Sequence, residues 1–391
     1  MSAPLKHLRI VDLTTVLMGP YTTQLLADMG AEVIKVEAPE GDATRGIGPA
    51  LSEDMGPLYL QANRGKRSIA LDLKTATGKA ALLDIVARAS VVVTSIRPAA
   101  LERLGLGFEA FRAVNQTIVH AALTGYGSGG PYAERPAYDD LIQAAIGIPD
   151  LYQRAGGTEL RYLPIAVADR FVGAFAVGAV LAALRQAETD KRAVHVEVPM
   201  FETMAQLVLG DHIGGLLFDP PAGPSGYQRL LSHNRRPYPT RDGHVAALIY
   251  TDRQWRAFLA GTGHGDRFDA DPRFRNMSTR TANIDAIYEM VTDIFLGYTT
   301  AEAVEMLRGM DIPVMPINSI DALMDDEHLA AVGFFQDIDH PTEGKLRMPA
   351  PPLRFDGATE RPAPAPKCGQ DSEAILRELG YSDERIAEVL P

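Results

Sequence analysis

The sequence predicts an α/β protein, with a mainly parallel sheet in a large domain and a smaller α+β domain after it. Over roughly the first 200 residues, buried-strand patterns alternate with helix patterns of about 10–15 residues, as they do in βαβ units. Residues 218–243 interrupt this alternation with five prolines and three glycines, which is typical of a loop or linker. Strand and helix patterns then resume over a shorter stretch.

Each strand of the large domain is predicted from a short apolar run, and each helix from apolar residues that recur every three or four positions. Pro20 near the start of the first helix and Gly30 at its end are typical helix boundaries. The strands are expected at residues 8–13, 32–37, 68–73, 90–95, 117–123 and 194–200. The helices are expected at residues 20–30, 75–89, 171–187 and 201–217.

The second half of the chain has its own set of elements. Strands are expected at residues 244–250 and 314–317, and helices at residues 252–261, 281–296, 300–310, 371–380 and 382–390. The predicted domains are a large domain over residues 1–205, completed by 331–391, a linker over 206–240, and a small domain over 241–330.

Composition excludes several classes of protein. The 38 Lys and Arg against 50 Asp and Glu give a net charge of −12, which disfavours a general nucleic-acid surface. Cys368 is the only cysteine, so a disulfide-stabilised secreted scaffold is excluded. With no uninterrupted apolar run of about 18 residues and no signal-peptide pattern, we expect a cytoplasmic protein without a membrane span.

The segment "GYGSGG", residues 125–130, matches G-x-G-x-x-G and follows a predicted strand. A dinucleotide fingerprint has to open a helix, because the pyrophosphate lies on the N-terminus of that helix. Pro131 and a loop pattern follow here instead, so a glycine-rich loop lining a cleft is the favoured interpretation. The nine histidines show no metal-ligand spacing, and no metal site is predicted.

Asp169 ends the apolar run 163–168 and precedes a helix pattern rich in glycine and alanine. The simpler interpretation is an N-cap, since Asp is favoured there. A carboxylate at a helix N-terminus is also kept ionised by the helix dipole, and the free N–H groups nearby can stabilise an oxyanion. The pattern therefore permits a nucleophile without requiring one.

Cationic residues follow several strands of the predicted sheet, where ligands of parallel sheets bind. Most are expected to be solvated surface groups, Arg64 and Lys74 in particular. Arg97 and Arg103 flank a turn directly after a strand and are better candidates for holding phosphates. The full set is Lys35, Arg45, Arg64, Lys66, Arg67, Lys74, Arg97 and Arg103.

Taken together, these segments resemble the class III CoA-transferases, the family of formyl-CoA transferase, carnitine CoA-transferase and α-methylacyl-CoA racemase. The matching segments are "LRIVDLTTVLMGPYTTQLLADMGAEVIKVEAPEGDATR", "NRGKRSIALDLK", "RPAALERLGLG", "GYGSGGPYAERPAYDDLIQAAIG", "VADRFVG" and "ILRELGYSDERI". They occur in family order over nearly the whole chain, and six in order are far more specific than any one.

The resemblance implies that Asp169 attacks an acyl-CoA thioester and that CoA passes through a covalent aspartyl intermediate to an acceptor carboxylate. It implies CoA or acyl-CoA as substrate, no tightly bound cofactor, a Rossmann-like large domain, and two chains interlocked as a homodimer. The implied CoA contacts are Thr15, Val16, Leu17, Met18, Leu71, Lys74, Ser95, Ile96, Arg97, Arg103, Tyr126, Gly127, Pro136, Ala137, Tyr138 and Asp139.

The chain departs from particular members of that family. Formyl-CoA transferase-like members have His-Val-Gln-Ala where Thr15–Met18 stand, an arginine in place of Ala38, and a glycine-rich loop near residues 234–237. Racemase-like members have a histidine at the place of Tyr138, and a tyrosine with a pKa near ~10 is a poor acid–base partner. A CoA-transferase is therefore favoured over a 2-methylacyl-CoA racemase, and a non-catalytic CoA-binding homologue is the third interpretation.

Two assignments stay open on the sequence. Arg170, Arg235 and Arg236 either meet a second carboxylate of the acceptor, which would make it a dicarboxylate, or are surface charges. Asp139 either orients Tyr138 or the substrate carbonyl, or stabilises a turn.

Overall fold

The computed structural model describes residues 3–357 and 361–390. The chain forms two compact units. The larger contains Met1–Ile146, Leu163–Gln206 and Glu327–Pro391, and the smaller contains Gly147–Tyr162 and Leu207–Asp326. The ends of the predicted large domain, residues 1–2 and 391, and its residues 358–360 lie outside the described part of the chain.

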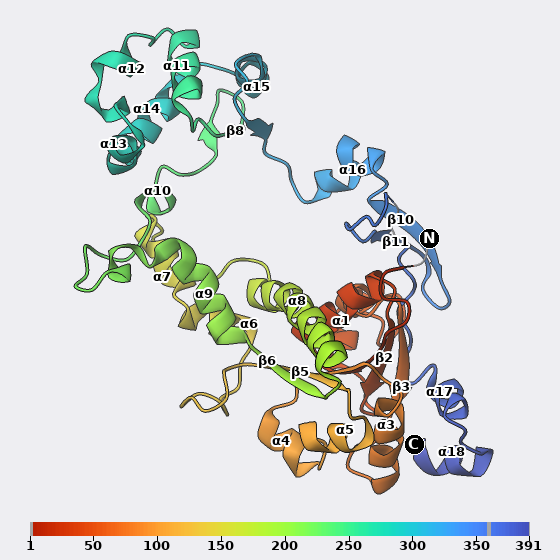
Figure 1. Ribbon diagram of the computed structural model, residues 1–391. Helices are drawn as coiled ribbons and strands as arrows, with labels where there is room; N and C mark the ends of the chain where they lie inside the picture. Colours follow the sequence, from red (N-terminus) through yellow and green to blue (C-terminus); the bar gives the residue numbers. More distant parts are fainter. Residues whose placement is uncertain (1–2, 358–360, 391) are drawn as a thin grey trace. The chain divides into compact units, whose positions relative to one another are not determined.

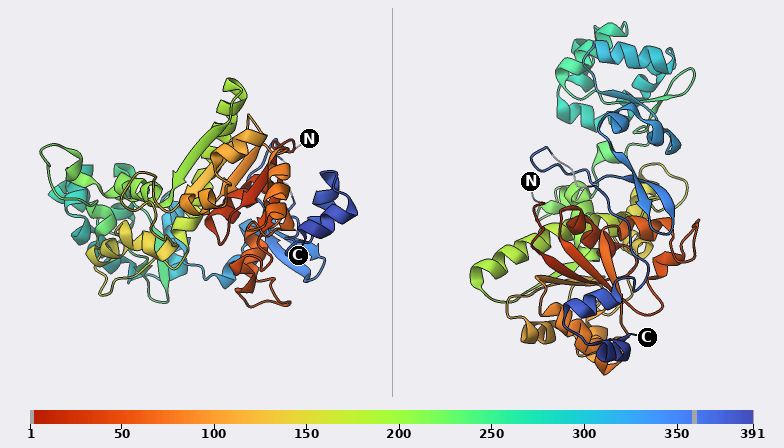
Figure 2. Two further views of the ribbon diagram at one scale, coloured as in Figure 1. Left: turned by 90° about the horizontal axis from the view of Figure 1, so that it is seen from below. Right: turned by 90° about the vertical axis from the view of Figure 1, so that its right-hand side faces the viewer.

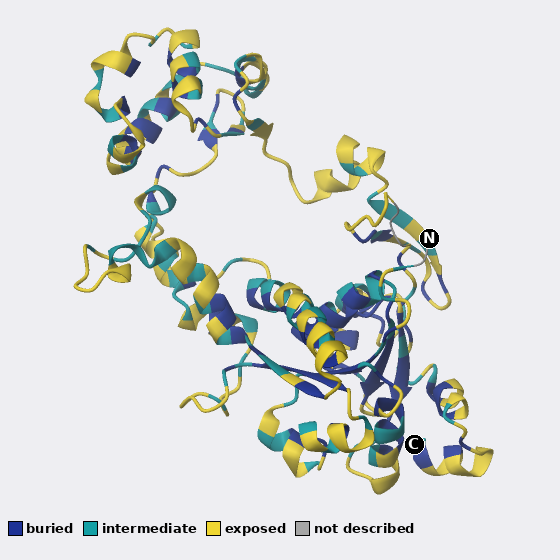
Figure 3. Cartoon of the chain, in the orientation of Figure 1, coloured by how far each residue is buried: buried dark blue, intermediate teal, exposed yellow. Residues whose placement is uncertain are grey.

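Six strands of the larger unit form one sheet in the order β3-β2-β1-β4-β5-β6, and every pair is parallel. All residues of β4 and β5, and all but the first of β1 and β2, are buried (Figure 3), which explains their continuous apolar runs. The predicted α/β class with a parallel sheet is confirmed. The strands are β1 Arg9–Leu13, β2 Glu32–Glu37, β3 Lys66–Ala70, β4 Val91–Thr94, β5 Val119–Thr124 and β6 Val194–Pro199.

Helices cover both faces of this sheet (Figure 1). On one face pack α1 (Met18–Asp28) and α8 (Val167–Asp190). On the other face pack α3 (Ala76–Val86), α5 (Phe108–Val114), α17 (Ser372–Glu378) and α18 (Asp383–Val389). Figure 2 shows the C-terminal helices beside helices from the first third of the chain, and α18 contacts α3. The end of the chain therefore completes the hydrophobic core of its beginning.

The helices α1 and α8 approach closely because a glycine of α8 faces α1. A Cβ atom at Gly173 would lie 2.7 Å from the carbonyl oxygen of Met18. Thr22 Oγ1 donates a hydrogen bond to the carbonyl oxygen of Gly173 at 3.0 Å. The small residues of α8 thus fix its N-terminal half against the start of α1.

Two ion pairs are wholly buried beside β1. Lys66 Nζ lies 2.9 Å from Asp12 Oδ2, and Lys35 Nζ lies 3.0 Å from Asp42 Oδ2, with none of the four side chains exposed to solvent. Burial raises the pKa of the Asp12 carboxyl, but the charges of Lys66 and Lys35 outweigh burial and hold that pKa below its ordinary value. Asp12 is therefore an ionised core residue.

The smaller unit is built on a short antiparallel sheet of β7 (Tyr238–Pro239), β8 (His244–Ala247) and β9 (Val314–Pro316). Its core is aromatic, with Trp255, Phe258 and Phe295 in mutual contact or near contact. Its helices are α7 Ile148–Arg154, α10 Gln228–Leu231, α11 Asp252–Gly261, α12 Arg267–Ala270, α13 Met277–Ala282, α14 Ile284–Phe295 and α15 Thr300–Gly309.

The remaining elements join or decorate these cores. A hairpin of β10 (Phe335–His340) and β11 (Gly344–Pro349) belongs to the larger unit, and α9 (Met200–His212) runs from the larger unit into the smaller. The other helices are α2 Pro57–Ala62, α4 Pro98–Arg103, α6 Asp139–Ala145 and α16 Glu327–Ala331, with 3-10 turns at Ala43–Gly46, Gly214–Leu217, Pro272–Phe274 and Asp321–Asp325.

Some predicted boundaries differ from the structure. The helix predicted at 201–217 ends at His212, because Gly214 takes a left-handed conformation, with φ of 55°. The units also divide the chain at other residues than predicted: 147–162 and most of the expected linker lie in the smaller unit. The reason is tertiary, since α7 contacts α10 and Arg154 Nη2 donates to the Ser225 carbonyl oxygen at 2.6 Å.

By length and composition, α8 is the one helix of the described residues that could cross a membrane, with a mean hydropathy of 1.8. The sequence has no uninterrupted apolar run of about 18 residues, and α8 meets the length and composition test although Asp169 and Arg170 interrupt its apolar residues. One such helix indicates little, since core helices of soluble proteins pass the same test. Here α8 packs against α1, β5 and β6.

We predict that Lys66→Met destabilises the larger unit by about 3 kcal/mol, because it leaves the buried Asp12 carboxylate without its closest counter-ion. The matched control is Arg67→Met at the next residue, where the ion pairs to Glu32 and Glu378 are partly exposed and worth at most about 1 kcal/mol. Urea unfolding followed by far-UV circular dichroism measures both. Equal losses in the two variants would contradict the prediction.

Candidate active site

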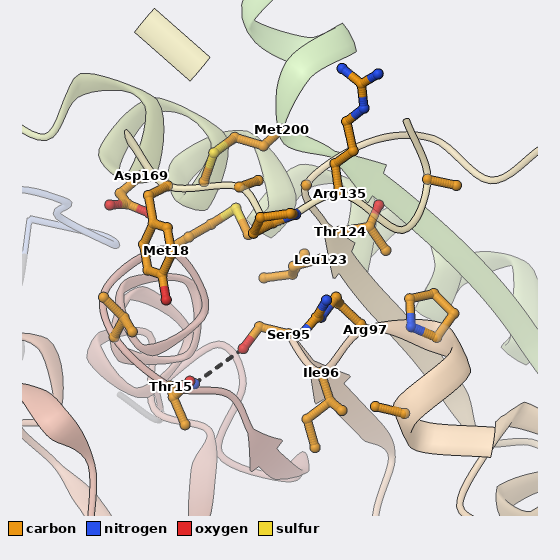
Figure 4. Close-up of a pocket in the computed structure, with 18 residues that line it drawn as sticks. Thr15, Met18, Ser95, Ile96, Arg97, Leu123, Thr124, Arg135, Asp169 and Met200 are labelled. Atoms are coloured by element: carbon orange, nitrogen blue, oxygen red, sulfur yellow. Dashed lines mark hydrogen bonds between the residues drawn. The ribbon is translucent and has the colours of Figure 1, made fainter. Parts of the chain in front are cut away.

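A cavity of about 380 Å³ opens at the carboxyl ends of β1, β4 and β5 in the larger unit. The strand order reverses between β1 and β4, and ligands of open parallel sheets bind at such a point. Figure 4 shows that the side chains around it come from the loop after β1, the turn after β4, the loop after β5, and α8. The lining residues are Thr15, Val16, Met18, Ser95, Ile96, Arg97, Pro98, Ala100, Leu123, Thr124, Gly125, Ala133, Arg135, Pro136, Ala137, Tyr138, Asp169 and Met200.

The structure brings many of the predicted site residues together and leaves others apart. Those that line the cavity with Asp169 are Thr15, Val16, Met18, Ser95, Ile96, Arg97, Pro136, Ala137 and Tyr138. Those that the structure places elsewhere are Leu17, Leu71, Lys74, Arg103, Tyr126, Gly127 and Asp139. Leu17 and Leu71 are buried, and Leu71 belongs to the apolar core on one face of the sheet. Lys74 and Arg103 are exposed away from the cavity wall.

The loop between β1 and α1 is held in an uncommon conformation. Val16 has a left-handed backbone, with φ of 69°, which is costly for a β-branched residue. The N–H of Thr15 donates to Ser95 Oγ at 3.1 Å, and the N–H of Val16 donates to Asp42 Oδ1 at 3.4 Å. Lys35 Nζ also donates to the carbonyl oxygen of Thr14 at 3.0 Å. The buried ion pair of Lys35 and Asp42 thus supports the strained loop.

Several cations listed from the sequence are structural. Lys35 and Lys66 form the buried pairs described above, and Arg45 is buried against Glu37, with Nη2 2.7 Å from Oε1. Arg64 was expected on the surface but is 5% exposed, with Nη2 2.6 Å from Asp28 Oδ2. Arg64 precedes β3 and Asp28 ends α1, and a single sequence does not show that these two segments become neighbours, so this part of the prediction failed.

The glycine-rich loop after β5 is anchored by carboxylates. Glu202 Oε1 accepts from the N–H of Gly127 at 2.9 Å, and Glu197 Oε1 accepts from the N–H of Ser128 at 3.0 Å. Glu197 Oε2 also accepts from Ser128 Oγ at 2.8 Å. These N–H groups are therefore already paired with anions of the chain, which argues against a phosphate cradle. Gly125 at the start of this loop lines the cavity, in agreement with the interpretation of a glycine-rich loop lining a cleft.

Asp169 is the third residue of α8 and does not cap it. The N-cap is Ala166, whose methyl side chain cannot accept a hydrogen bond. The cap comes from Asp139 at the start of α6, whose Oδ1 accepts from the N–H of Ala168 at 2.7 Å and from the N–H of Asp169 at 3.3 Å. The interpretation of Asp169 as an N-cap is thus wrong, and these two N–H groups are not free to stabilise an oxyanion.

The surroundings of Asp169 make its carboxyl a weaker acid than usual. Burial, and then the negative charge of Asp139, raise its pKa to about 6, although the Arg170 charge and a hydrogen bond from the Met18 N–H act in the opposite direction. The expectation that the helix dipole would keep the pKa of Asp169 low is therefore wrong, because burial and the Asp139 charge have the larger effect. At pH 7 the carboxyl is still mostly ionised and, as a stronger base than an ordinary aspartate, a better nucleophile.

Two arginines line the cavity with Asp169 (Figure 4): Arg97, the N-cap of α4, and Arg135, in the loop after β5. Arg135 was missed in the sequence, because it lies in a long loop eleven residues after the end of β5 and not directly after a strand as Arg97 does. The Arg135 guanidinium carbon lies 3.9 Å from the centre of the Tyr132 ring, which steadies it. Arg170 lies over the Tyr21 ring instead, 4.5 Å from its centre.

The other two candidate acceptor-binding arginines, Arg235 and Arg236, belong to the smaller unit and are exposed. Among the described residues, no group of three or more His, Cys, Asp or Glu side chains is placed to hold a metal ion.

Comparison with known proteins identifies the family. The model of CoA-transferase family III matches residues 5–372. The chain belongs to CoA-transferase family III. It is an enzyme of this class, and the resemblance noted in the sequence is confirmed.

Curated CoA-transferases match this chain over nearly its whole length. This chain is 31% identical to the succinate–glutarate CoA-transferase of Agrobacterium fabrum, over 96% of each chain. It is 32% identical to an acyl-CoA transferase of Fusarium pseudograminearum, over 98% of this chain and 86% of that one.

Solved structures agree with the same assignment. A CaiB/BaiF family protein from Brucella suis is 30% identical and superposes with a TM-score of 0.78, over 97% of this chain and 100% of that one. Rv3272 from Mycobacterium tuberculosis, in an orthorhombic form, is 27% identical with a TM-score of 0.82, over 96% and 99%.

We predict that Asp169→Asn raises the free energy of unfolding at pH 7.5 by about 1–3 kcal/mol. A carboxyl whose pKa is raised by folding stabilises the protein below its unfolded pKa, near 3.8, and loses that contribution as the pH rises through about 6. The neutral amide avoids the loss, so its advantage should shrink towards pH 4.5. Denaturant titrations at both pH values measure this. The control, Asp140→Asn at an exposed site, should show no such dependence, and an equal effect of Asp169→Asn at both pH values would contradict the prediction.

Proposed function

We propose that this enzyme transfers CoA from an acyl-CoA thioester to a small dicarboxylate, with Asp169 as the nucleophile. The observation that carries the proposal is the Asp169 carboxylate on the wall of a cavity that also has Arg97 and Arg135 on its wall. The related enzymes named above and others at 27–30% identity act on glutarate, mesaconate, oxalate and malate by their names, which supports a dicarboxylate acceptor.

In the proposed cycle, an Asp169 carboxylate oxygen attacks the thioester carbonyl carbon, the C–S bond breaks, and CoA leaves as its thiolate. The thiolate then attacks the Asp169 carbonyl of the mixed anhydride, which releases the donor acid as a carboxylate and leaves an aspartyl-CoA thioester. The acceptor carboxylate attacks this thioester, the C–S bond breaks, and a mixed anhydride of Asp169 and the acceptor forms while the CoA thiolate is freed again. The thiolate finally attacks the acceptor carbonyl, which gives the new acyl-CoA and restores the Asp169 carboxylate. Each step replaces one acyl bond by another, so no oxidant or external base is needed.

The chain's own residues supply position and charge for this cycle. The Met18 N–H donates to the Asp169 carboxylate and helps to hold it in place, while the N–H groups of Ala168 and Asp169 bind Asp139. Arg97 and Arg135 provide positive charge for CoA phosphates or for the second carboxylate of the acceptor. Tyr138, exposed on the cavity rim, is a polar group in reach of the entering substrate.

We also propose the finer features implied by the family. The strand order β3-β2-β1-β4-β5-β6 supports a Rossmann-like description of the larger unit. Exposed apolar residues such as Ile320 and Leu353 support burial in an interlocked homodimer, and light scattering distinguishes this from a monomer of 42.3 kDa. A cytoplasmic location, and CoA as a substrate without a tightly bound cofactor, stay predictions.

We predict that brief incubation with a matching acyl-CoA adds acyl or CoA mass to the protein, and that hydroxylamine trapping and peptide mapping locate the adduct at Asp169. Asp169→Asn should give no adduct and lose at least about 10³-fold in turnover while it still binds CoA. The panel of thioesters identifies the donor. No adduct with any thioester, together with solvent deuterium exchange into a 2-methylacyl-CoA, would establish the racemase instead. If the protein binds CoA but shows neither an adduct nor exchange, it is a CoA-binding protein without this catalytic activity.

We predict that Arg97→Ala and Arg135→Ala each raise the KM for acyl-CoA or for the acceptor by about 10–100-fold, because each removes a charged hydrogen-bond donor from the cavity wall. Steady-state kinetics with one substrate varied at a time shows which substrate each arginine binds. The control is Arg112→Ala on α5, where the guanidinium is exposed and pairs with Glu109. An unchanged KM for both substrates in both cavity variants would remove these residues from the site.

A further inference from the structure

The first turn of α8, which carries Asp169, is held by a side chain from another helix. A side-chain cap normally comes from the N-cap residue of the same helix, as it does at Thr75, Thr251 and Thr299. Here the Asp139 carboxylate, from the first residue of α6, accepts from two N–H groups of that turn, those of Ala168 and Asp169, through Oδ1, at 2.7 and 3.3 Å. The position of the Asp169 backbone is therefore set by α6 as well as by α8.

Gln143, one turn further along α6, extends this contact to the segment that leads into α8. Its side chain is fully buried. Gln143 Nε2 donates to Asp139 Oδ2 at 2.5 Å, and Gln143 Oε1 accepts from the N–H of Leu163 at 2.9 Å. Nε2 also lies 3.4 Å from the carbonyl oxygen of Ile165. The Asp139 carboxylate and the Gln143 amide thus hold residues 163–169 at three places: Leu163, Ile165, and the N–H groups of residues 168 and 169.

The choice of a carboxylate for this cap has a consequence for Asp169. Asparagine or serine would cap a helix as well as aspartate does. The carboxylate of Asp139 places a second negative charge beside Asp169, which disfavours the ionised form of Asp169. A cap that served only the stability of α8 would avoid this repulsion. The charge is instead useful if Asp169 has to be a more basic, and so more reactive, carboxylate.

The other groups near Asp169 are of the opposite charge or neutral. Arg170 follows it on α8, the Met18 N–H comes from the start of α1, and Tyr138 precedes α6. Arg97 and Arg135 line the same cavity. The negative charge that acts on Asp169 is that of Asp139, so substitution of Asp139 is the direct way to change the local negative charge.

We propose that Asp139 and Gln143 are positioning residues for the nucleophile: together they hold the first turn of α8 so that the Asp169 carboxylate faces the cavity. The proposal rests on the proposed function of Asp169 as nucleophile. It predicts an effect on the reaction step and on the acid limb of the pH profile, with little effect on acyl-CoA binding.

The test exchanges the carboxylate of Asp139 and the amide of Gln143, first one at a time and then together. Asp139→Asn turns an amide N–H towards Gln143 Nε2, so two donors meet, and Gln143→Glu sets two carboxylates against each other. The double variant restores one amide against one carboxylate but moves the negative charge one turn away from Asp169. We expect each single variant to lose about 10²-fold in kcat with KM for acyl-CoA within threefold, and the double variant to recover most of that loss. Asp140→Asn, an equal charge change on the exposed neighbour, should leave kcat unchanged.

A second measurement does not depend on turnover. The Asp169 carboxyl resonance is assigned in ¹³C-aspartate-labelled protein by its loss in Asp169→Asn, and is titrated in each variant. We expect its midpoint, near pH 6 in the natural chain, to move to lower pH in Asp139→Asn and in the double variant, and to stay in Asp140→Asn. If Asp139 acted only as a structural cap, the double variant would recover kcat and the titration midpoint of Asp169 would not change in any variant. An unchanged midpoint, or single variants with unchanged kcat, would overturn the proposal. Absence of any acyl adduct on the natural chain would instead overturn the proposed function.

Discussion

The contact between α8 and α1 determines where the Asp169 carboxylate lies. Gly173 lets the two helices approach until the carbonyl oxygen of Met18 lies only 2.7 Å from the place that a Cβ atom would take, and Thr22 adds a hydrogen bond across the contact. Met18 also begins α1 and directs its N–H towards Asp169. Any larger residue at 173 would separate the helices, and the carboxylate would lose both its donor and its place at the cavity. Close backbone packing is thus the condition for the chemistry.

Acidic residues of this negatively charged chain are largely used to bind its own backbone near the site. Glu197 and Glu202 hold the glycine-rich loop, Asp42 holds the loop after β1, and Asp139 holds the start of α8. The cavity wall itself has one carboxylate, from Asp169, and two guanidinium groups. An anionic CoA thioester therefore meets a locally favourable field in spite of the net charge of −12.

Reactivity at the site is maintained at a cost in stability. Burial and the Asp139 charge both disfavour the ionised form of Asp169, yet that form is the one a nucleophile needs. Val16 adds backbone strain in the neighbouring loop. Both are supported from outside the cavity by residues with no solvent-exposed surface, such as Lys35 and Gln143. Such a site is expected where the fold is stable enough to hold unfavourable groups in fixed positions.

The sequence by itself determined the strands and most helices of the larger unit, because their apolar periods and glycine or proline boundaries are local signals. It also identified Asp169 and the segments after β1, β4 and β5 that reach the cavity, since parallel strands end on one edge of a sheet. Only the tertiary structure decided that Asp139, thirty positions before Asp169, supplies the cap and much of the local charge. It likewise decided that Arg64 and Lys66 are buried in ion pairs while Arg135 reaches the cavity. Hydrogen bonds and ion pairs between distant segments depend on which strands and helices become neighbours, and that choice leaves no periodic pattern in a single sequence.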